Sequence, residues 1–205
     1  MNEATSDNTA RLWQDITVVD NFLPGAEQSA IYHTLSNGAW THGWRSRSGE
    51  GAQPFWHQHF VGPKGSLQTG QEEQGEEKLA RDAPLLHAFW GRLSTSYLSA
   101  HDLHSCYANG LPYGTDGALH TDSLAPGACT AVYYPHTEWD PDWGGETILF
   151  NEQKDDILAA IYPKPNRLLI FPGFVHHVAR GVSRTCPVMR ITLMFKTQIN
   201  AASIR

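Results

Sequence analysis

The second half of the chain is divided into short apolar segments separated by Gly, Pro and Asp. Segments rich in branched and aromatic residues and bounded by such turn residues are typical of β-strands. The candidates lie at 103–108, 118–122, 129–134, 147–150, 157–162, 167–171, 175–179 and 189–196. Many short strands at this spacing predict a sandwich or a jelly roll.

The first half of the chain adds helices to this pattern. A short strand is expected at 16–19, a helix from Pro24-Gly25 to about Ser36, and another strand at 54–60. A longer helix begins near Asp82, with apolar residues at spacings of three and four: Leu86, Phe89, Trp90, Leu93 and Tyr97. We expect the helices to pack on one sheet of the β unit, because this packing buries their apolar faces. The expected fold class is therefore α+β.

A chain of 205 residues fits a single domain. We expect a helical front at 1–102 and a jelly-roll core at 103–197. Two polar, glycine-rich stretches in the front, 46–53 and 63–77, predict mobile loops. Such loops can be lids over a site or solvated insertions without a function, and the sequence favours neither.

Composition argues against several classes of partner. The net charge of −6 speaks against a broad basic surface, so no nucleic-acid partner is expected. The N-terminus is polar and acidic, and no apolar run approaches the roughly 18 residues of a membrane helix. Cys106, Cys129 and Cys186 form no Cys-x-x-Cys pair, which is typical of reduced thiols. We therefore expect a cytoplasmic protein without a membrane partner.

The segment Gly117-Ala118-Leu119-His120-Thr121-Asp122-Ser123 contains the first chemical signal. In an extended chain, residues two apart share a face, so His120 and Asp122 can point an imidazole and a carboxylate at one position. With a second, distant histidine they would form the facial triad of two histidines and one carboxylate that holds Fe(II). From the residues alone, His176 and His177 are both candidates for that histidine, because both follow a strand and the Pro172-Gly173 turn.

A buried cation is expected on the last strand. Ile191, Leu193 and Phe195 share one face of the segment, and Arg190 and Thr192 share the other. An arginine inside a barrel requires an anionic partner, and its guanidinium matches a carboxylate in bidentate geometry. A metal centre together with this arginine would fit a cosubstrate with a chelating end and a distant carboxylate, such as 2-oxoglutarate.

The region from about Leu103 to Lys196 resembles the catalytic domain of the Fe(II)/2-oxoglutarate-dependent oxygenases, within the prolyl-4-hydroxylase-like branch. The matching motifs occur in the family's order: Tyr113-Gly114-Thr115-Asp116-Gly117 before His120-x-Asp122, Val132-Tyr133-Tyr134, Trp143-Gly144-Gly145-Glu146-Thr147, Asn166 to Gly173, and Arg190-x-Thr192. The resemblance implies a double-stranded β-helix, or jelly-roll, core.

The resemblance also implies roles for individual residues. The family's spacing after its Phe-Pro-Gly turn selects His177 over His176 as the metal ligand beside His120 and Asp122. Arg190 matches the arginine that binds 2-oxoglutarate, with Thr192 nearby, and Tyr134 matches a tyrosine that often reaches the same carboxylate. The segment between His177 and Arg190 is longer here than in many prolyl hydroxylases, so Arg184 is a rival to Arg190.

The expected function is an Fe(II)- and 2-oxoglutarate-dependent dioxygenase that uses O2, supported by ascorbate, to hydroxylate a small metabolite or an amino-acid-derived intermediate. One alternative is a peptidyl-prolyl hydroxylase, and another is a barrel that binds a metabolite without turnover. Several aromatic residues and histidines could line the mouth of the pocket: Trp44, Trp56, Trp139, Trp143, His57, His59 and His136.

Overall fold

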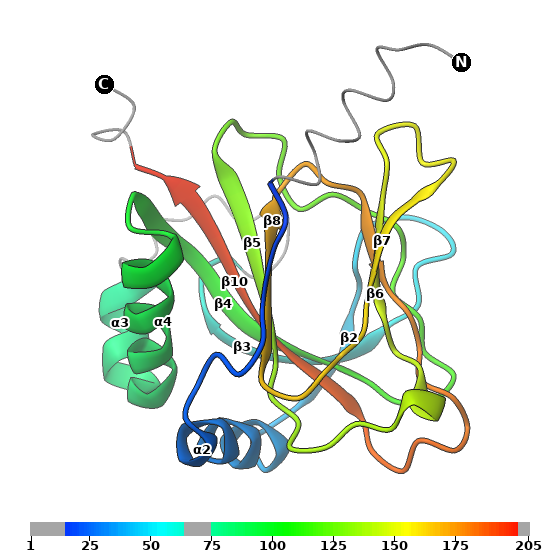
Figure 1. Ribbon diagram of the computed structural model, residues 1–205, viewed down its shortest axis with the longest axis horizontal. Helices are drawn as coiled ribbons and strands as arrows, with labels where there is room; N and C mark the ends of the chain where they lie inside the picture. Colours follow the sequence, from blue (N-terminus) through cyan, green and yellow to red (C-terminus); the bar gives the residue numbers. More distant parts are fainter. Residues whose placement is uncertain (1–14, 64–74, 201–205) are drawn as a thin grey trace.

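The computed structural model describes residues 15–63 and 75–200, and in these ranges the chain forms two antiparallel sheets and three α-helices. The larger sheet contains, in spatial order, β1 (Thr17–Val19), β8 (Arg167–Pro172), β5 (Ala128–Tyr134), β10 (Arg190–Ile199), β4 (His101–Leu111), β3 (Phe55–Val61) and β2 (Thr41–Trp44). The smaller sheet contains β7 (Ile157–Ile161), β6 (Thr147–Phe150) and β9 (His177–Ala179). The two sheets lie across from each other (Figure 1).

The helices α2 (Gly25–Ser36), α3 (Gly75–Asp82) and α4 (Pro84–Tyr97) lie on the side of the larger sheet that faces away from β6 and β7 (Figure 1). Their buried residues share one core with the sheet: Ile31, Leu35, Leu79, Leu86, Phe89, Trp90 and Leu93 pack with Ile191, Leu193 and Phe195 of β10. The predicted packing of helices on one sheet is thus confirmed. Tyr97 differs from the rest of the predicted stripe, since 44% of it is exposed.

A second core fills part of the space between the two sheets. It contains Val132, Tyr134, Leu169, Phe171 and Met194 from the larger sheet and Leu149, Leu158, Ala159 and Ile161 from the smaller one. Successive side chains of β10 therefore alternate between two environments, as the period of a strand requires. The odd-numbered residues face the helices, and the even-numbered residues face the space between the sheets.

Most predicted strands are present, but the segment 118–122 is not a continuous strand. It makes one isolated bridge, between His120 and His177, and then the amides of Asp122 and Ser123 both donate to the Gly173 carbonyl. β9 begins at His177 and not at 175, because the Val175 amide donates to the Pro172 carbonyl in a turn.

Two elements of the helical front were not predicted. β2 is exposed over three of its four residues, so it lacks the apolar alternation that indicates a strand. α3 buries only Leu79 and begins at Gly75, inside the stretch that was expected to be a loop. The rest of that expected loop, 64–74, lies outside the described residues. The expected loop at 46–53 contains no helix or strand.

Candidate metal centre and its cavity

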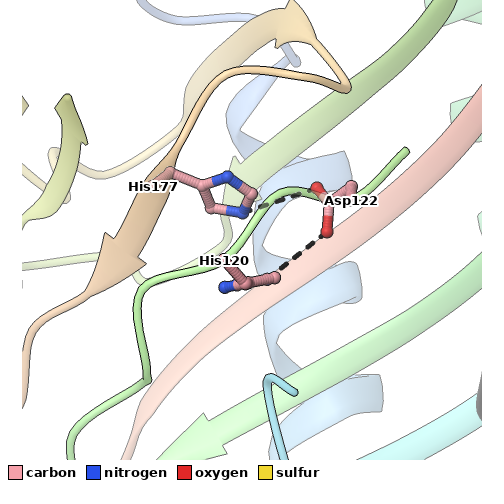
Figure 2. Close-up of side chains that lie close together, drawn as sticks. All are labelled: His120, Asp122 and His177. Carbon is pink, nitrogen blue, oxygen red and sulfur yellow. Dashed lines mark ion pairs between the residues drawn. The ribbon is translucent and has the colours of Figure 1, made fainter. Parts of the chain in front are cut away.

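His120, Asp122 and His177 meet at one point between the sheets. Their candidate ligand atoms all lie within 4.8 Å of one another (Figure 2). His120 Nε2 is 3.4 Å from Asp122 Oδ1, and His177 Nε2 is 3.4 Å from Asp122 Oδ2. The backbone sets this arrangement, because His120 and His177 exchange hydrogen bonds, N to O, of 3.1 and 2.9 Å.

Both imidazole rings are oriented by their second nitrogen. His120 Nδ1 lies 2.8 Å from the Ala118 carbonyl oxygen, and His177 Nδ1 lies 2.9 Å from that of Val175. A carbonyl only accepts hydrogen bonds, so each Nδ1 must carry the proton and each Nε2 presents a lone pair. Histidine ligands are held in this way in metal sites. The donor set therefore fits a divalent metal.

The charges of the centre favour the same conclusion. Burial lowers the pKa of His177 to about 4, so its imidazole is neutral at physiological pH. Burial alone would raise the pKa of Asp122, but the adjacent Lys196 ammonium opposes burial, and that pKa lies well below its usual range. A neutral imidazole at His177 and an ionised carboxylate at Asp122 are protonation states that metal binding requires.

Asp122 is further held by the larger sheet. The Thr130 hydroxyl donates to Asp122 Oδ2 at 2.6 Å, and the Lys196 ammonium donates to the same oxygen. Thr130 and Lys196 are paired across β5 and β10. Both hydrogen bonds go to Oδ2, so Oδ1 is the oxygen left for a metal.

His176 lies outside the centre. Burial and the neighbouring Lys154 lower its pKa, and Glu152 opposes them, which places its side chain near the loop after β6. The structure therefore brings His177, and not its neighbour, next to Asp122.

Arg190 lies in the wall between the sheets with 1% of its surface exposed. Its Nε donates to the Gly145 carbonyl at 2.5 Å, and its Nη2 donates to the Thr147 hydroxyl at 2.9 Å. Tyr134 reaches the same hydroxyl, donating at 2.7 Å. Gly145 adopts φ +83°, and a Cβ there would lie 3.0 Å from Arg190 Cδ, so both its conformation and its lack of a side chain are required.

The metal centre and Arg190 open into one cavity of about 600 Å³. Even-numbered residues of β10 line one wall: Arg190, Thr192, Met194 and Lys196. Tyr134 is not among the lining residues and contacts this wall through Thr147. Arg184 is exposed and is not among them either. Of the aromatic residues and histidines expected at the pocket mouth, the described part of the chain brings only Trp44 to the lining.

Residues 106–195 match the family model of the 2OG-Fe(II) oxygenase superfamily. Over these residues, which are somewhat less than half of the chain, the sequence is similar to that superfamily. The family implies Fe(II), 2-oxoglutarate and O2, and it indicates an enzyme. A search of curated protein sequences found no match.

Solved structures similar to this chain share its fold at low sequence identity. A prolyl hydroxylase from Trichoplax adhaerens, solved with a hypoxia inducible factor peptide, is 17% identical with a TM-score of 0.62, covering 96% of this chain and 89% of that one. A prolyl-4-hydroxylase from Pseudomonas putida is 20% identical with a TM-score of 0.60, covering 95% and 97%. The epimerase SnoN from nogalamycin biosynthesis is 15% identical with a TM-score of 0.56, covering 95% and 83%. At these identities the likeness concerns the fold alone.

Three residues around the metal centre and Arg190 were missed by sequence reasoning. The sequence did indicate that Lys196 faces the cavity, because alternate residues of β10 share a face and Lys196 therefore lies on the same face as Arg190 and Thr192. Thr130 likewise lies on the same face of β5 as Tyr134. Thr147 gave no signal, since its contact with Arg190 depends on how the two sheets face each other.

No helix in the described ranges has the length and apolar character needed to span a membrane.

Proposed function

We propose that this protein is an Fe(II)- and 2-oxoglutarate-dependent hydroxylase of a small molecule, with His120, Asp122 and His177 as the iron ligands. One observation carries the proposal: two Nε2 lone pairs and an ionised carboxylate meet in a cavity whose wall also contains the guanidinium of Arg190. Bound iron would supply O2 activation coupled to 2-oxoglutarate decarboxylation, with oxidation of a substrate C–H bond. Ascorbate would support this chemistry by keeping the iron reduced.

The residues around the centre hold the ligands in position. The carbonyls of Ala118 and Val175 fix the planes of the two imidazole rings. Thr130 and Lys196 restrain Asp122 Oδ2, so the carboxylate is expected to bind the metal through Oδ1 alone. Three protein ligands of this kind leave open positions on the metal for the cosubstrate and O2.

Arg190 would bind the distant carboxylate of 2-oxoglutarate. Its guanidinium is fixed by Gly145 and Thr147 at the side of the cavity, and burial from water strengthens its attraction for an anion. The Thr192 hydroxyl lines the same wall and could donate to that carboxylate. Tyr134 would act as a positioning residue through Thr147.

A small molecule fits the volume of the cavity, since pockets of roughly 300–1,000 Å³ are typical of small-ligand sites. A peptidyl-proline substrate is the second candidate, because two of the similar structures are prolyl hydroxylases. We also infer that the two sheets form the family's double-stranded β-helix and that the chain is a single domain. Formation of succinate from 2-oxoglutarate would separate an enzyme from a barrel that only binds a metabolite.

The proposal is tested by removing the ligands one at a time. His120→Ala, Asp122→Ala and His177→Ala should each lose bound Fe(II) and succinate formation, because two protein donors hold Fe(II) weakly. His176→Ala is the matched control and should retain iron, since its side chain lies outside the centre. Iron content is measured by metal analysis, and a metabolite pool is screened by mass for gain of one oxygen atom. Wild-type iron content in Asp122→Ala would contradict the proposal.

A further inference from the structure

The cavity is strongly cationic within an acidic protein. Among the lining residues in the described ranges, Arg45, Arg47, Arg190 and Lys196 are basic, and Asp122 is the one carboxylate. The whole chain has a net charge of −6, so this concentration of positive charge is local. A concave site lined by one sign of charge attracts ligands of the opposite sign.

Two of these cations already have a role in the proposed function. Arg190 faces the position of the cosubstrate, and Lys196 is paired with Asp122. Arg45 and Arg47 remain. Arg45 donates to the Ala52 carbonyl, and Arg47 donates to the Ser48 carbonyl at 3.3 Å. Neither guanidinium is paired with a carboxylate within residues 15–63 and 75–200.

The segment that bears these arginines is tied to the metal centre. The Ala118 amide donates to the Ser46 hydroxyl at 3.2 Å, and the Asp116 amide donates to the Gln53 side chain at 2.9 Å. Both amides belong to the segment that leads into His120. The arginines are therefore held over the cavity by contacts on both sides of their loop.

An aromatic surface adjoins the arginines. Trp44 stacks on His57, with ring centroids 4.0 Å apart and an interplanar angle of 5°. Tyr107 packs near both rings, at 6.2 Å from Trp44 and 5.1 Å from His57. Trp44 and Tyr107 both line the cavity. This part of the wall can receive an apolar body next to a guanidinium.

We propose that the substrate is a small carboxylate with an apolar body, and that Arg47 binds its carboxylate while Trp44 and Tyr107 contact the body. Arg45 fixes the loop through Ala52 and adds to the positive field. This inference rests on the proposed function, because it assigns the substrate of the same cavity. It is independent of the cosubstrate, whose distant carboxylate is assigned to Arg190.

The test is a binding measurement with matched probes. The protein is loaded with redox-inert Zn(II) and saturating 2-oxoglutarate, so that Arg190 is occupied. Hexanoate, 3-phenylpropionate and N-acetylproline are then each compared with the corresponding primary amide by ligand-observed NMR. We expect at least one carboxylate to bind about tenfold or more tightly than its amide, as a charge-assisted hydrogen bond predicts.

Arg47→Gln should remove that preference by weakening the carboxylate about tenfold while the amide is unchanged. Arg184→Gln, an exposed arginine outside the cavity lining, is the matched control and should keep the preference. Equal binding of every carboxylate and its amide, or no binding of any carboxylate, would overturn the inference. So would an unchanged preference in both Arg47→Gln and the Arg45→Gln/Arg47→Gln double variant.

Failure of the proposed function gives a different result. If the Fe(II)-loaded wild-type protein formed no succinate from 2-oxoglutarate, the hydroxylase assignment would fail whatever the probes showed. If succinate formed and no carboxylate preference existed, only the substrate class would be wrong.

Discussion

Lys196 places a nearly buried ammonium directly against a metal ligand. Its side chain is 14% exposed, that of Asp122 is 9% exposed, and Thr130 completes the contact. In the absence of metal, the ammonium compensates the charge of a carboxylate that has little access to water. The ammonium therefore offsets part of the cost of burying the ionised carboxylate in the metal-free protein. A bound metal cation would offset part of the same cost.

We predict that Lys196→Met destabilises the metal-free protein by about 3–5 kcal/mol, because it leaves Asp122 as an unpaired buried charge. Zn(II) should restore much of this loss, since the cation replaces the ammonium beside the carboxylate. Urea unfolding with and without Zn(II) measures both effects. Adding Asp122→Asn should recover stability in the metal-free state. A Lys196→Met protein as stable as the wild type without metal would show that the pair contributes nothing.

Arg190 and Arg184 are the two candidates for the arginine that binds the distant carboxylate of 2-oxoglutarate. Arg190→Ala should weaken 2-oxoglutarate binding by about 2–5 kcal/mol, because it leaves a desolvated carboxylate unpaired. Iron content should remain near the wild-type level, since no metal ligand contacts Arg190 among the described residues. Isothermal titration with 2-oxoglutarate on Zn(II)-loaded protein gives the affinities. Loss of affinity in Arg184→Ala but not in Arg190→Ala would contradict the assignment.

The elements of the fold meet at His136, just after β5. Its Nε2 accepts a hydrogen bond of 2.9 Å from the Ile191 amide of β10, and its ring contacts Tyr32 of α2 and Trp139. The sequence placed this histidine among candidates for the pocket mouth, whereas the structure buries it with 2% exposure. Burial, with Arg190 nearby, lowers its pKa to about 3.

We predict that stability falls as the pH is lowered below about 6.5. Native His136 stays neutral down to about pH 3, whereas the unfolded chain takes up the proton near 6.5, so protons favour unfolding between these values. At pH 5 the cost from His136 is about 2 kcal/mol relative to pH 8, and His177, whose pKa burial lowers to about 4, adds a similar cost in the metal-free protein. Urea unfolding of the metal-free protein across this range measures it. His136→Gln, which keeps an acceptor for Ile191, should remove about half of the dependence, and an unchanged slope in this variant would refute the role of His136.

Strand parity and helical periodicity predicted much of the fold, because both are local properties. The alternation along β10 correctly separated Ile191, Leu193 and Phe195 from Arg190 and Thr192. The choice between His176 and His177 could not be made from alternation alone, since the hydrogen bonds of the Pro172-Gly173 turn decide which of the two side chains faces the metal centre. That Arg47 and the metal ligands line one cavity could not be predicted from residue spacing, because it is created by contacts between distant segments.

In the molecule as a whole, the main apolar core and the residues of the candidate site lie in different places. The helices and the outer face of the larger sheet share the main apolar core. Arg190 and Thr192 lie on the inner face of that sheet, His177 lies on β9 of the smaller sheet, and His120 and Asp122 lie in the segment that pairs with His177. Substitutions in the cavity can therefore change binding without removing the residues that hold the helices in place.

The reciprocal backbone hydrogen bonds between His120 and His177 have a consequence for metal choice. They bring the two imidazoles together by strand pairing, so the ligand atoms are in place before any ion arrives. A preformed site of nitrogen and oxygen donors follows the general affinity order, in which Ni(II), Cu(II) and Zn(II) bind more tightly than Fe(II). The identity of the ion in the cell is then decided by which metals are available, and traces of zinc or copper would occupy the centre at the expense of iron.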